Sequence, residues 1–151
     1  MKIVHGDLIK LALNGEFDVI IHGCNCHCAM GAGIAKSIKS TFPEAYKADC
    51  ETIKGSKDKL GTISFATVDR DGTKITIVNG YTQYHWRGSS VLVDYDAVRS
   101  VMRSVKSRFS GKRIGYPKIG AGLAKGDWEK ISIIIDQELD GEDHTLVEYS
   151  A

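Results

Sequence analysis

The apolar residues of this chain fall into two patterns, short continuous runs and positions that recur every three or four residues. Runs such as Val19-Ile20-Ile21 are bounded by turn-forming residues and have the length of a buried strand. The runs predict strands over Lys2–His5, Phe17–Cys24, Thr62–Thr67, Lys74–Val78, Arg113–Pro117 and His144–Tyr149.

Helical spacing is clearest over residues 95–109, where apolar residues recur at positions 98, 101, 102 and 105. Positions 131, 134, 135 and 139 mark a second amphipathic helix. Shorter helices are predicted over Asp7–Leu13 and Gly33–Phe42, and the proline after Phe42 ends the latter. Glu44–Asp49 is expected to add another turn or two.

The predicted strands and helices alternate along most of the chain, which is typical of a sheet covered by helices on both faces. The segment Asp69-Arg70-Asp71-Gly72 between two strands indicates one antiparallel hairpin within that sheet. We therefore expect an α/β fold, a three-layer α/β/α sandwich with a mixed, mostly six-stranded sheet. Residues 1–151 form a single domain, long enough to bury a core without disulfides.

The charge balance gives no sign of a nucleic-acid partner. Lys and Arg total 20 against 19 Asp and Glu, so the net charge is +1, and the basic residues are scattered. No hydrophobic stretch approaches the roughly 20 residues of a membrane span, so no membrane partner is expected. The N-terminal residues lack the apolar segment of a signal peptide, and a cytoplasmic location is the expectation.

The most informative segment joins the predicted strand at 17–24 to the helix at Gly33. It reads His22-Gly23-Cys24-Asn25-Cys26-His27-Cys28-Ala29-Met30-Gly31-Ala32-Gly33-Ile34-Ala35. Such a loop presents free backbone N–H groups and the positive end of a helix dipole to a ligand at the carboxyl end of the strand. By itself, it is equally compatible with an ordinary turn.

A second loop of the same kind resolves that ambiguity. The predicted strand at 113–117 is followed by Lys118-Ile119-Gly120-Ala121-Gly122-Leu123-Ala124-Lys125-Gly126-Asp127-Trp128 and then by an amphipathic helix. Two such units in one small domain predict a crevice beyond the carboxyl ends of the strands, bounded by glycines on both sides. This arrangement favours a diphosphate ligand.

These pieces resemble the macro domain family, which binds ADP-ribose. The resemblance rests on Gly6-Asp7-Leu8, on Asn25 with the loop Met30–Ala35, on Pro117–Leu123 and on Tyr149, and it covers nearly the whole chain. Within the family, the chain looks most like the branch of ADP-ribose 1″-phosphate phosphatases and enzymes that remove ADP-ribose from carboxylate side chains.

The resemblance implies a role for each of these residues. Asp7 would accept a hydrogen bond from the adenine, although an aspartate there can also cap the first helix. Tyr149 would cover the adenine or proximal ribose, or pack in the core. Asn25 would contact the distal ribose, or hold its own turn. The implied ligand-binding set is Asp7, Leu8, Asn25, Met30, Gly31, Gly33, Ile34, Pro117, Ile119, Gly120, Ala121, Gly122, Leu123 and Tyr149.

Three other features are less decisive. Lys118 and Lys125 either supply charge to the ligand or are solvated loop lysines, and the second interpretation is favoured. The segment Asn79–Arg87, rich in aromatic residues, either walls the distal ribose or forms an ordered connection. The segment that holds Cys24, Cys26 and Cys28 could be a metal site. Its spacing is not that of paired zinc ligands, and Cys50 is the one other cysteine in the sequence. We expect these thiols to fill a tight transition as small side chains, with no metal, no cofactor and no disulfide.

The candidate catalytic residues are His27, Asp127 and Asn25. An imidazole with an unperturbed pKa of about 6.5 suits acid–base work at the anomeric centre. Asp127 is the second candidate, or a helix-terminal acid. Relatives that use a lysine adduct carry an aspartate where this chain has Ala124, and their lysine has no clear counterpart in Gln83-Tyr84-His85. A covalent lysine mechanism is therefore not expected.

The leading hypothesis is an ADP-ribose 1″-phosphate phosphatase that also hydrolyses ADP-ribose esters on proteins. Its expected partners are ADP-ribose, its derivatives and ADP-ribosylated proteins. The alternative is a non-catalytic reader of ADP-ribose, and a more distant one is a zinc-binding module built on the cysteines.

Overall fold

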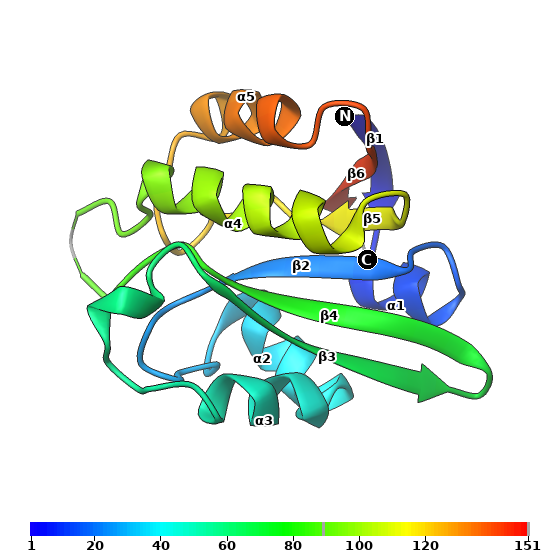
Figure 1. The fold of residues 1–151 in the computed structure, drawn as a ribbon, viewed down its shortest axis with the longest axis horizontal. Helices are drawn as coiled ribbons and strands as arrows, with labels where there is room; N and C mark the ends of the chain where they lie inside the picture. The colour runs from blue at the N-terminus through cyan, green and yellow to red at the C-terminus, as the bar shows by residue number, and fades with distance from the viewer. Residues whose placement is uncertain (89, 151) are drawn as a thin grey trace.

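The computed structural model describes residues 1–88 and 90–150 and shows a sheet between two layers of helices (Figure 1). The elements in chain order are β1 (Lys2–Gly6), α1 (Leu8–Leu13), β2 (Val19–Cys24), α2 (Gly33–Thr41), α3 (Pro43–Cys50), a short 3₁₀ helix (Lys57–Lys59), β3 (Ile63–Arg70), β4 (Thr73–Tyr81), α4 (Tyr95–Phe109), β5 (Arg113–Tyr116), α5 (Trp128–Glu138) and β6 (Asp143–Tyr149).

The six strands lie in the order β1-β6-β5-β2-β4-β3 and pair in parallel except for β3 with β4. Helices α4 and α5 cover one face, and α1, α2 and α3 cover the other (Figure 1). The predicted three-layer α/β/α fold with a mixed six-stranded sheet is confirmed. No helix in the described part of the chain is long and apolar enough to cross a membrane.

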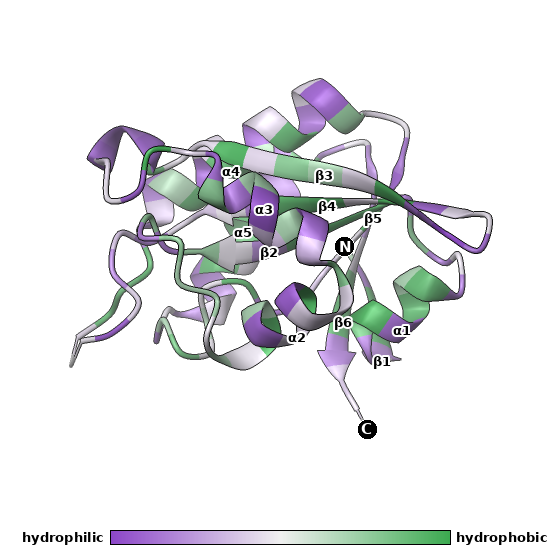
Figure 2. Cartoon of the chain, turned by 90° about the horizontal axis from the view of Figure 1, so that it is seen from below, coloured by the Kyte–Doolittle hydropathy of each residue, from purple (hydrophilic) through white to green (hydrophobic). Residues whose placement is uncertain are grey.

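Strand β2 begins with the apolar run Val19–Ile21 because both of its faces are buried. Ile20 packs on the α1–α3 side with Ile38 of α2. Val19 and Ile21 pack on the other side with α4 and α5. Figure 2 shows hydrophobic residues along the central strands β4 and β5 and hydrophilic residues on the exposed surface of α2 and α3. A continuous apolar run is the pattern of a central parallel strand.

The hairpin is longer than predicted and forms one edge of the sheet. Strands β3 and β4 pair as far as Arg70 with Thr73, which leaves a turn of only Asp71 and Gly72. Both turn residues have positive φ, 54° and 90°, as a two-residue turn between twisted strands requires. The sequence signal located the hairpin, but Asp69 and Arg70 belong to the strand.

The segment after α2 forms the predicted further turns as a separate helix, α3, which extends one residue beyond the predicted range at each end. Helix α3 begins at Pro43, which is tolerated at the first helical position because no N–H is needed there. Its Glu44 accepts two hydrogen bonds from the Arg70 guanidinium, at 2.8 and 2.9 Å. This pair joins α3 to the far end of β3.

Gly115 in β5 allows the close approach of Phe17 to the middle of the sheet. A Cβ atom at position 115 would lie 2.8 Å from three atoms of the Phe17 ring, which is closer than a real contact permits. Gly115 pairs with Ile20 of β2, so its backbone belongs to the parallel β2–β5 ladder.

We expect Gly115→Ala to lower the free energy of unfolding by about 1–3 kcal/mol, because an added methyl group overpacks this contact. Urea denaturation followed by circular dichroism measures the change. Gly31→Ala is the matched control, since a Cβ there meets nothing within 4 Å. Equal stability of the Gly115→Ala variant and the parent would mean that Phe17 moves aside without cost.

Candidate ligand-binding cleft

The candidate site lies beyond the carboxyl ends of β2 and β5, which are neighbours in the sheet. The helix that follows β2 lies on one face of the sheet, and the helix that follows β5 lies on the other (Figure 1). Because the two chain segments diverge, a crevice opens between them, and open α/β sheets bind ligands at such points.

The cleft has a volume of about 560 Å³ and is lined by both glycine loops. Nine of the predicted ligand-binding residues lie in its wall: Asn25, Gly31, Gly33, Ile34, Pro117, Ile119, Gly120, Gly122 and Leu123. Trp86 and Leu123 remain exposed beside it, at 46% and 66%. The two loops that the sequence places about 90 residues apart therefore face a single cleft.

Helix α2 begins in the cleft wall without a side-chain cap. Its N-cap residue is Ala32, which offers no oxygen to the first N–H groups of the helix. By contrast, α1, α4 and α5 each begin with an aspartate that accepts a hydrogen bond from its own first turn. Ala32, Gly33 and Ile34 all line the cleft. The free N–H groups and the helix dipole therefore point to a place for an anion.

The second glycine loop is folded by its own backbone hydrogen bonds. The N–H of Ala121 donates to the Lys118 carbonyl, and the N–H of Gly126 donates to the Gly120 carbonyl at 2.7 Å. Ile119 donates to the carbonyl of Pro117. These bonds occupy the Ile119 and Ala121 amides. Within the described residues, the N–H groups of Gly120, Gly122 and Leu123 are left for a ligand.

The two glycines of this loop have different roles. Gly120 has φ +75°, and a Cβ there would lie 2.6 Å from Val93, so the fold itself requires glycine. Gly122 has no left-handed φ, and a Cβ at that position would meet nothing within 4 Å. The open space beside Gly122 is the cleft, since this residue lines it.

Asn25 organises the loop of residues 25–32, called the cleft loop below. Its Oδ1 accepts hydrogen bonds from the N–H of His27 at 2.8 Å and of Ala29 at 3.4 Å, and its Nδ2 donates to the Ala29 carbonyl at 2.8 Å. One amide hydrogen of the side chain remains available. Asn25 also lines the cleft, so it holds its own turn while facing a ligand.

His27 does not line the cleft. Its ring packs against Tyr84, His85 and Trp86, with centroids 4.6 to 5.2 Å apart. Desolvation, followed by the charges of His85 and nearby lysines, lowers its pKa below the usual value. Its Nε2 is buried without a hydrogen-bond partner in the described structure. His27 therefore supports Trp86 from behind the wall.

Asp127 also lies outside the cleft wall. Its Oδ1 accepts a hydrogen bond from the N–H of Glu129 at 3.0 Å, as the N-cap of α5. The structure thus shows a capping function for this carboxylate. Of the three candidate catalytic residues, only Asn25 faces the cleft.

The residues expected at the adenine end lie farther along the same edge of the sheet. Gly6 at the end of β1 pairs with Tyr149 at the end of β6, so Asp7 and Tyr149 are neighbours there. Asp7 caps α1 by accepting from the Lys10 N–H at 3.1 Å, and Leu8 is buried. Tyr149 is 78% exposed and is not part of the core.

Met30 and Ala121, also predicted as ligand-binding, do not line the cleft. Met30 is buried beneath the cleft loop with Cys24, Cys26 and Tyr81. Its side chain therefore forms part of the packing that supports the loop.

Nine lining residues were not assigned to a ligand from the sequence: Gly23, Cys24, Ala29, Ala32, Ala35, Gln83, Trp86, Lys118 and Ala124. Gln83 and Trp86 come from the aromatic-rich segment after β4, which partly walls the cleft. Lys118, interpreted as solvated, lines the cleft and forms an ion pair with Glu148 at 3.3 Å. Ala124 lines it as well. The aromatic content of residues 79–87 was the sequence feature that could have identified Gln83 and Trp86 as cleft residues.

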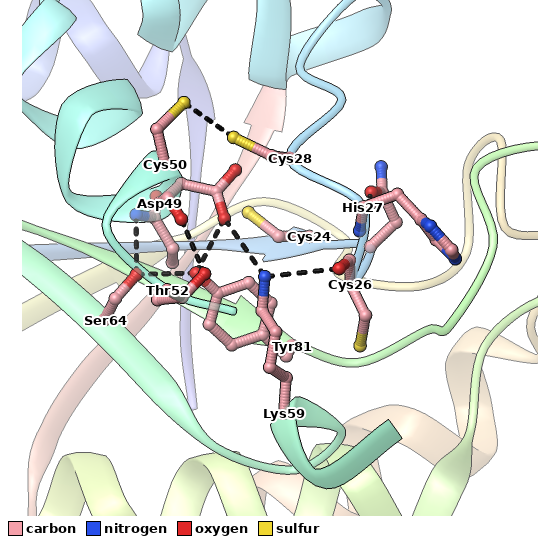
Figure 3. Close-up of polar contacts among 12 residues, drawn as sticks. Cys24, Cys26, His27, Cys28, Asp49, Cys50, Thr52, Lys59, Ser64 and Tyr81 are labelled. Carbon is pink, nitrogen blue, oxygen red and sulfur yellow. Dashed lines mark hydrogen bonds and ion pairs between the residues drawn. The ribbon is translucent and has the colours of Figure 1, made fainter. Parts of the chain in front are cut away.

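A buried polar network holds the cleft loop from below (Figure 3). The Lys59 ammonium donates to the Cys26 carbonyl at 3.2 Å and lies 3.8 Å from the Asp49 carboxylate. The Tyr81 hydroxyl donates to the same carboxylate oxygen at 2.7 Å, and burial raises the pKa of Tyr81 well above its usual value. Among the described residues, no group of three His, Cys, Asp or Glu side chains is placed to hold a metal ion.

Comparison with known proteins agrees with this geometry. A family model described as Macro domain matches residues 21–135. The "Uncharacterized 17.5 kDa protein in tk-vs intergenic region" of Enterobacteria phage T4 is 33% identical over 141 residues, covering 90% of this chain and 88% of that protein. The macrodomain of Thermus aquaticus DarG has the same fold, with a TM-score of 0.72 at 22% identity over 99% of this chain and 97% of that one.

Two relatives carry the names of enzymes. The ADP-ribose glycohydrolase OARD1 of Bos taurus is 27% identical over 97% of this chain and 89% of its own length. The ADP-ribose 1″-phosphate phosphatase of Candida albicans is 27% identical over 85% of this chain and 87% of its own length. Because the family model extends over most of the chain and the fold agrees, this protein belongs to the macro domain family.

Proposed function

We propose that the protein binds ADP-ribose across the carboxyl edge of its sheet and hydrolyses the phosphate from ADP-ribose 1″-phosphate. The observation that carries the proposal is the uncapped N-terminus of α2, which faces the second glycine loop across one cleft. Backbone N–H groups on both sides suit a diphosphate, and the one charged side chain lining the cleft in the described residues is Lys118.

The order of the strands supports one orientation of the ligand along the carboxyl edge of the sheet. Asp7 and Tyr149 at the ends of β1 and β6 would receive the adenine, and the loops after β5 and β2 the diphosphate. The distal ribose would then lie against Asn25 and Trp86. The names of two relatives, an ADP-ribose glycohydrolase and an ADP-ribose 1″-phosphate phosphatase, support this ligand and this class of reaction.

The chemistry proposed is direct attack of water without a covalent lysine. Ala124 and Gln83 both line the cleft, and neither can act as a nucleophile or general base there. The free amide hydrogen of Asn25 would orient the distal ribose or a water molecule, and backbone N–H groups would stabilise charge on the phosphate. Hydrolysis of ADP-ribose esters on proteins is proposed as a further activity of the same site.

A second function is favoured by one observation. In the part of the chain that the structure describes, no Asp, Glu or His side chain lines the cleft, so no carboxylate or imidazole faces the ligand as a general acid or base. This composition would suit a reader that binds ADP-ribose or ADP-ribosylated proteins without turnover.

We expect ADP-ribose to bind at least tenfold more tightly than AMP, because only ADP-ribose spans both glycine loops and reaches Asn25. Isothermal titration calorimetry with the two ligands measures the difference. Equal affinities would show that the cleft between β2 and β5 takes no part in binding.

We expect Gly122→Val to weaken ADP-ribose binding by tenfold or more, because its side chain would extend into the cleft that Gly122 lines. The melting temperature should change little, since no left-handed φ is lost and nothing is displaced. Gly120→Ala is the contrasting variant, which should lower the melting temperature through its clash with Val93 and its φ of +75°. Normal binding by a folded Gly122→Val variant would remove this loop from the site.

We expect phosphate release from ADP-ribose 1″-phosphate that is insensitive to a chelator. Asn25→Ala should lower turnover by roughly 10²-fold, because the cleft loop loses its organising side chain. Asp127→Ala should lower the melting temperature through a lost helix cap and leave turnover close to that of the parent. His27→Ala should raise KM more than it lowers kcat, since it acts through Trp86.

Phosphate release and binding are measured on each variant in parallel. A loss of turnover in Asp127→Ala with binding intact would return that residue to the mechanism. Chelator-sensitive activity would contradict the metal-free proposal. If the parent protein binds ADP-ribose tightly but releases no phosphate, the second function, that of a non-catalytic reader of ADP-ribose, would be established.

A further inference from the structure

Two of the four cysteines meet at the junction of the cleft loop and α3. Cys28 belongs to the cleft loop, and Cys50 is the last residue of α3, 22 positions later. Their Sγ atoms point toward one another and lie 2.6 Å apart (Figure 3). A disulfide bond is about 2.04 Å long, so a shift of about half an ångström would join them. The fold therefore already brings the two sulfur atoms close to bonding distance.

The pair differs from the other two cysteines in accessibility. Cys24 and Cys26 are buried, and Cys26 contacts the Gln83 carbonyl at 3.6 Å. Cys50 is exposed and Cys28 is partly exposed. A small oxidant in solution can therefore reach Cys50 directly, with Cys28 in contact behind it.

We propose that Cys28 and Cys50 are a modification site, at which a small-molecule disulfide oxidises the two thiols to a reversible disulfide that ties the cleft loop to α3. The reaction consumes one small-molecule disulfide and releases two small-molecule thiols. The protein loses two hydrogen atoms, and the sulfur atoms of the reagent are reduced.

The chemistry proceeds in two exchanges, and the exposed Cys50 reacts first. Its thiolate attacks one sulfur of the reagent, forms a mixed disulfide and expels one thiolate. The Cys28 sulfur then attacks the Cys50 sulfur, and the second reagent thiolate leaves. Burial, the Cys50 hydrogen bond and the Asp49 carboxylate raise the pKa of Cys28 to about 12, so Cys28 is the resolving thiol rather than the first to react.

The Cys28 thiol lies beside the Asp49 carboxylate (Figure 3). Asp49 precedes Cys50 on α3, and its carboxylate is close enough to influence the Cys28 thiol. The Oδ2 atom of Asp49 is buried and has no hydrogen-bond partner in the described structure. Its other oxygen accepts from the Tyr81 hydroxyl. The proton that Cys28 loses is taken up by the reagent thiolate that leaves, so the second reagent molecule is released as a thiol.

The disulfide would act on the part of the loop that lines the cleft. Cys28 has φ +59° and lies between His27 and Ala29, whose N–H groups both donate to Asn25. Asn25 and Ala29 line the cleft. Bonding Cys28 to α3 would hold these two residues in the arrangement that the structure shows. The formation of the bond does not depend on the ligand proposed for the cleft.

The test treats the full-length protein with oxidised glutathione, followed by trypsin digestion without reduction and mass spectrometry. Cys50 lies in tryptic peptide 48–54, and the other three cysteines lie in peptide 11–36. We expect these two peptides to be joined, and dithiothreitol to separate them. The oxidised protein should melt roughly 5–10 °C higher than the reduced protein. Amide hydrogen exchange should slow at residues 26–29.

Three variants identify the partners. Cys28→Ser and Cys50→Ser should lose the joined peptides and the rise in melting temperature, whereas Cys26→Ala should retain both. Joined peptides in Cys28→Ser would mean that a buried cysteine is the partner and would overturn the proposal. A persistent glutathione adduct on Cys50, or joined peptides without slower exchange at 26–29, would overturn it as well.

Discussion

The parallel pairing of β2 with β5 in the middle of the sheet is the constraint on which the rest of the structure depends. Val19 pairs with Ile114 and Ile20 with Gly115, so the two strands end at the same edge. Because α2 and α5 then leave toward opposite faces, the loops between them cannot fill the space beyond the strands. Gly115 permits this pairing while Phe17 packs against it. The cleft is therefore a consequence of strand order.

Given that crevice, its chemical character comes from backbone groups more than from side chains. Three of the helices are capped by aspartates, whereas α2 begins at Ala32 in the cleft wall with its N–H groups free. A capping carboxylate at that position would occupy the donors that an anionic ligand needs. The glycines opposite leave room for a ligand to approach the second set of amides. Both features favour binding a diphosphate and leave little acid–base chemistry within the wall.

The cleft loop is held in place by polar contacts as well as by packing. Lys59 reaches the Cys26 carbonyl from below while it neutralises Asp49, and Tyr81 donates to the same carboxylate. The desolvation free energy of two buried charges offsets much of their electrostatic attraction, so such a pair is weak evidence for a gain in stability. Its contribution here is geometric, because it fixes the carbonyl next to Asn25. The loop is thus positioned by residues that never face the ligand.

Hydrophobic spacing was enough to predict every strand and the long helices. An element that buries one or both faces must carry apolar residues at the matching positions of its own sequence. The ends of several elements differ from the predicted ones. The hairpin turn is two residues rather than four, because pairing continues to Arg70 once Asp71 and Gly72 both adopt positive φ. Helix α3 runs one residue beyond its predicted range at each end, and it packs on the sheet while Glu44 binds Arg70. Neither contact is visible in a local window of sequence.

The sequence by itself determined the fold class, the two glycine loops and the residue types gathered in them. It could not decide which side chains face the cleft. Asn25 and His27 are two positions apart in one loop, yet Asn25 lines the cleft and His27 packs behind Trp86. The contact of Cys28 with Cys50 likewise depends on how the loop packs against a distant helix. Spacing within a segment fixes local structure, but the direction of a loop side chain is set by its packing partners, and these come from distant parts of the chain.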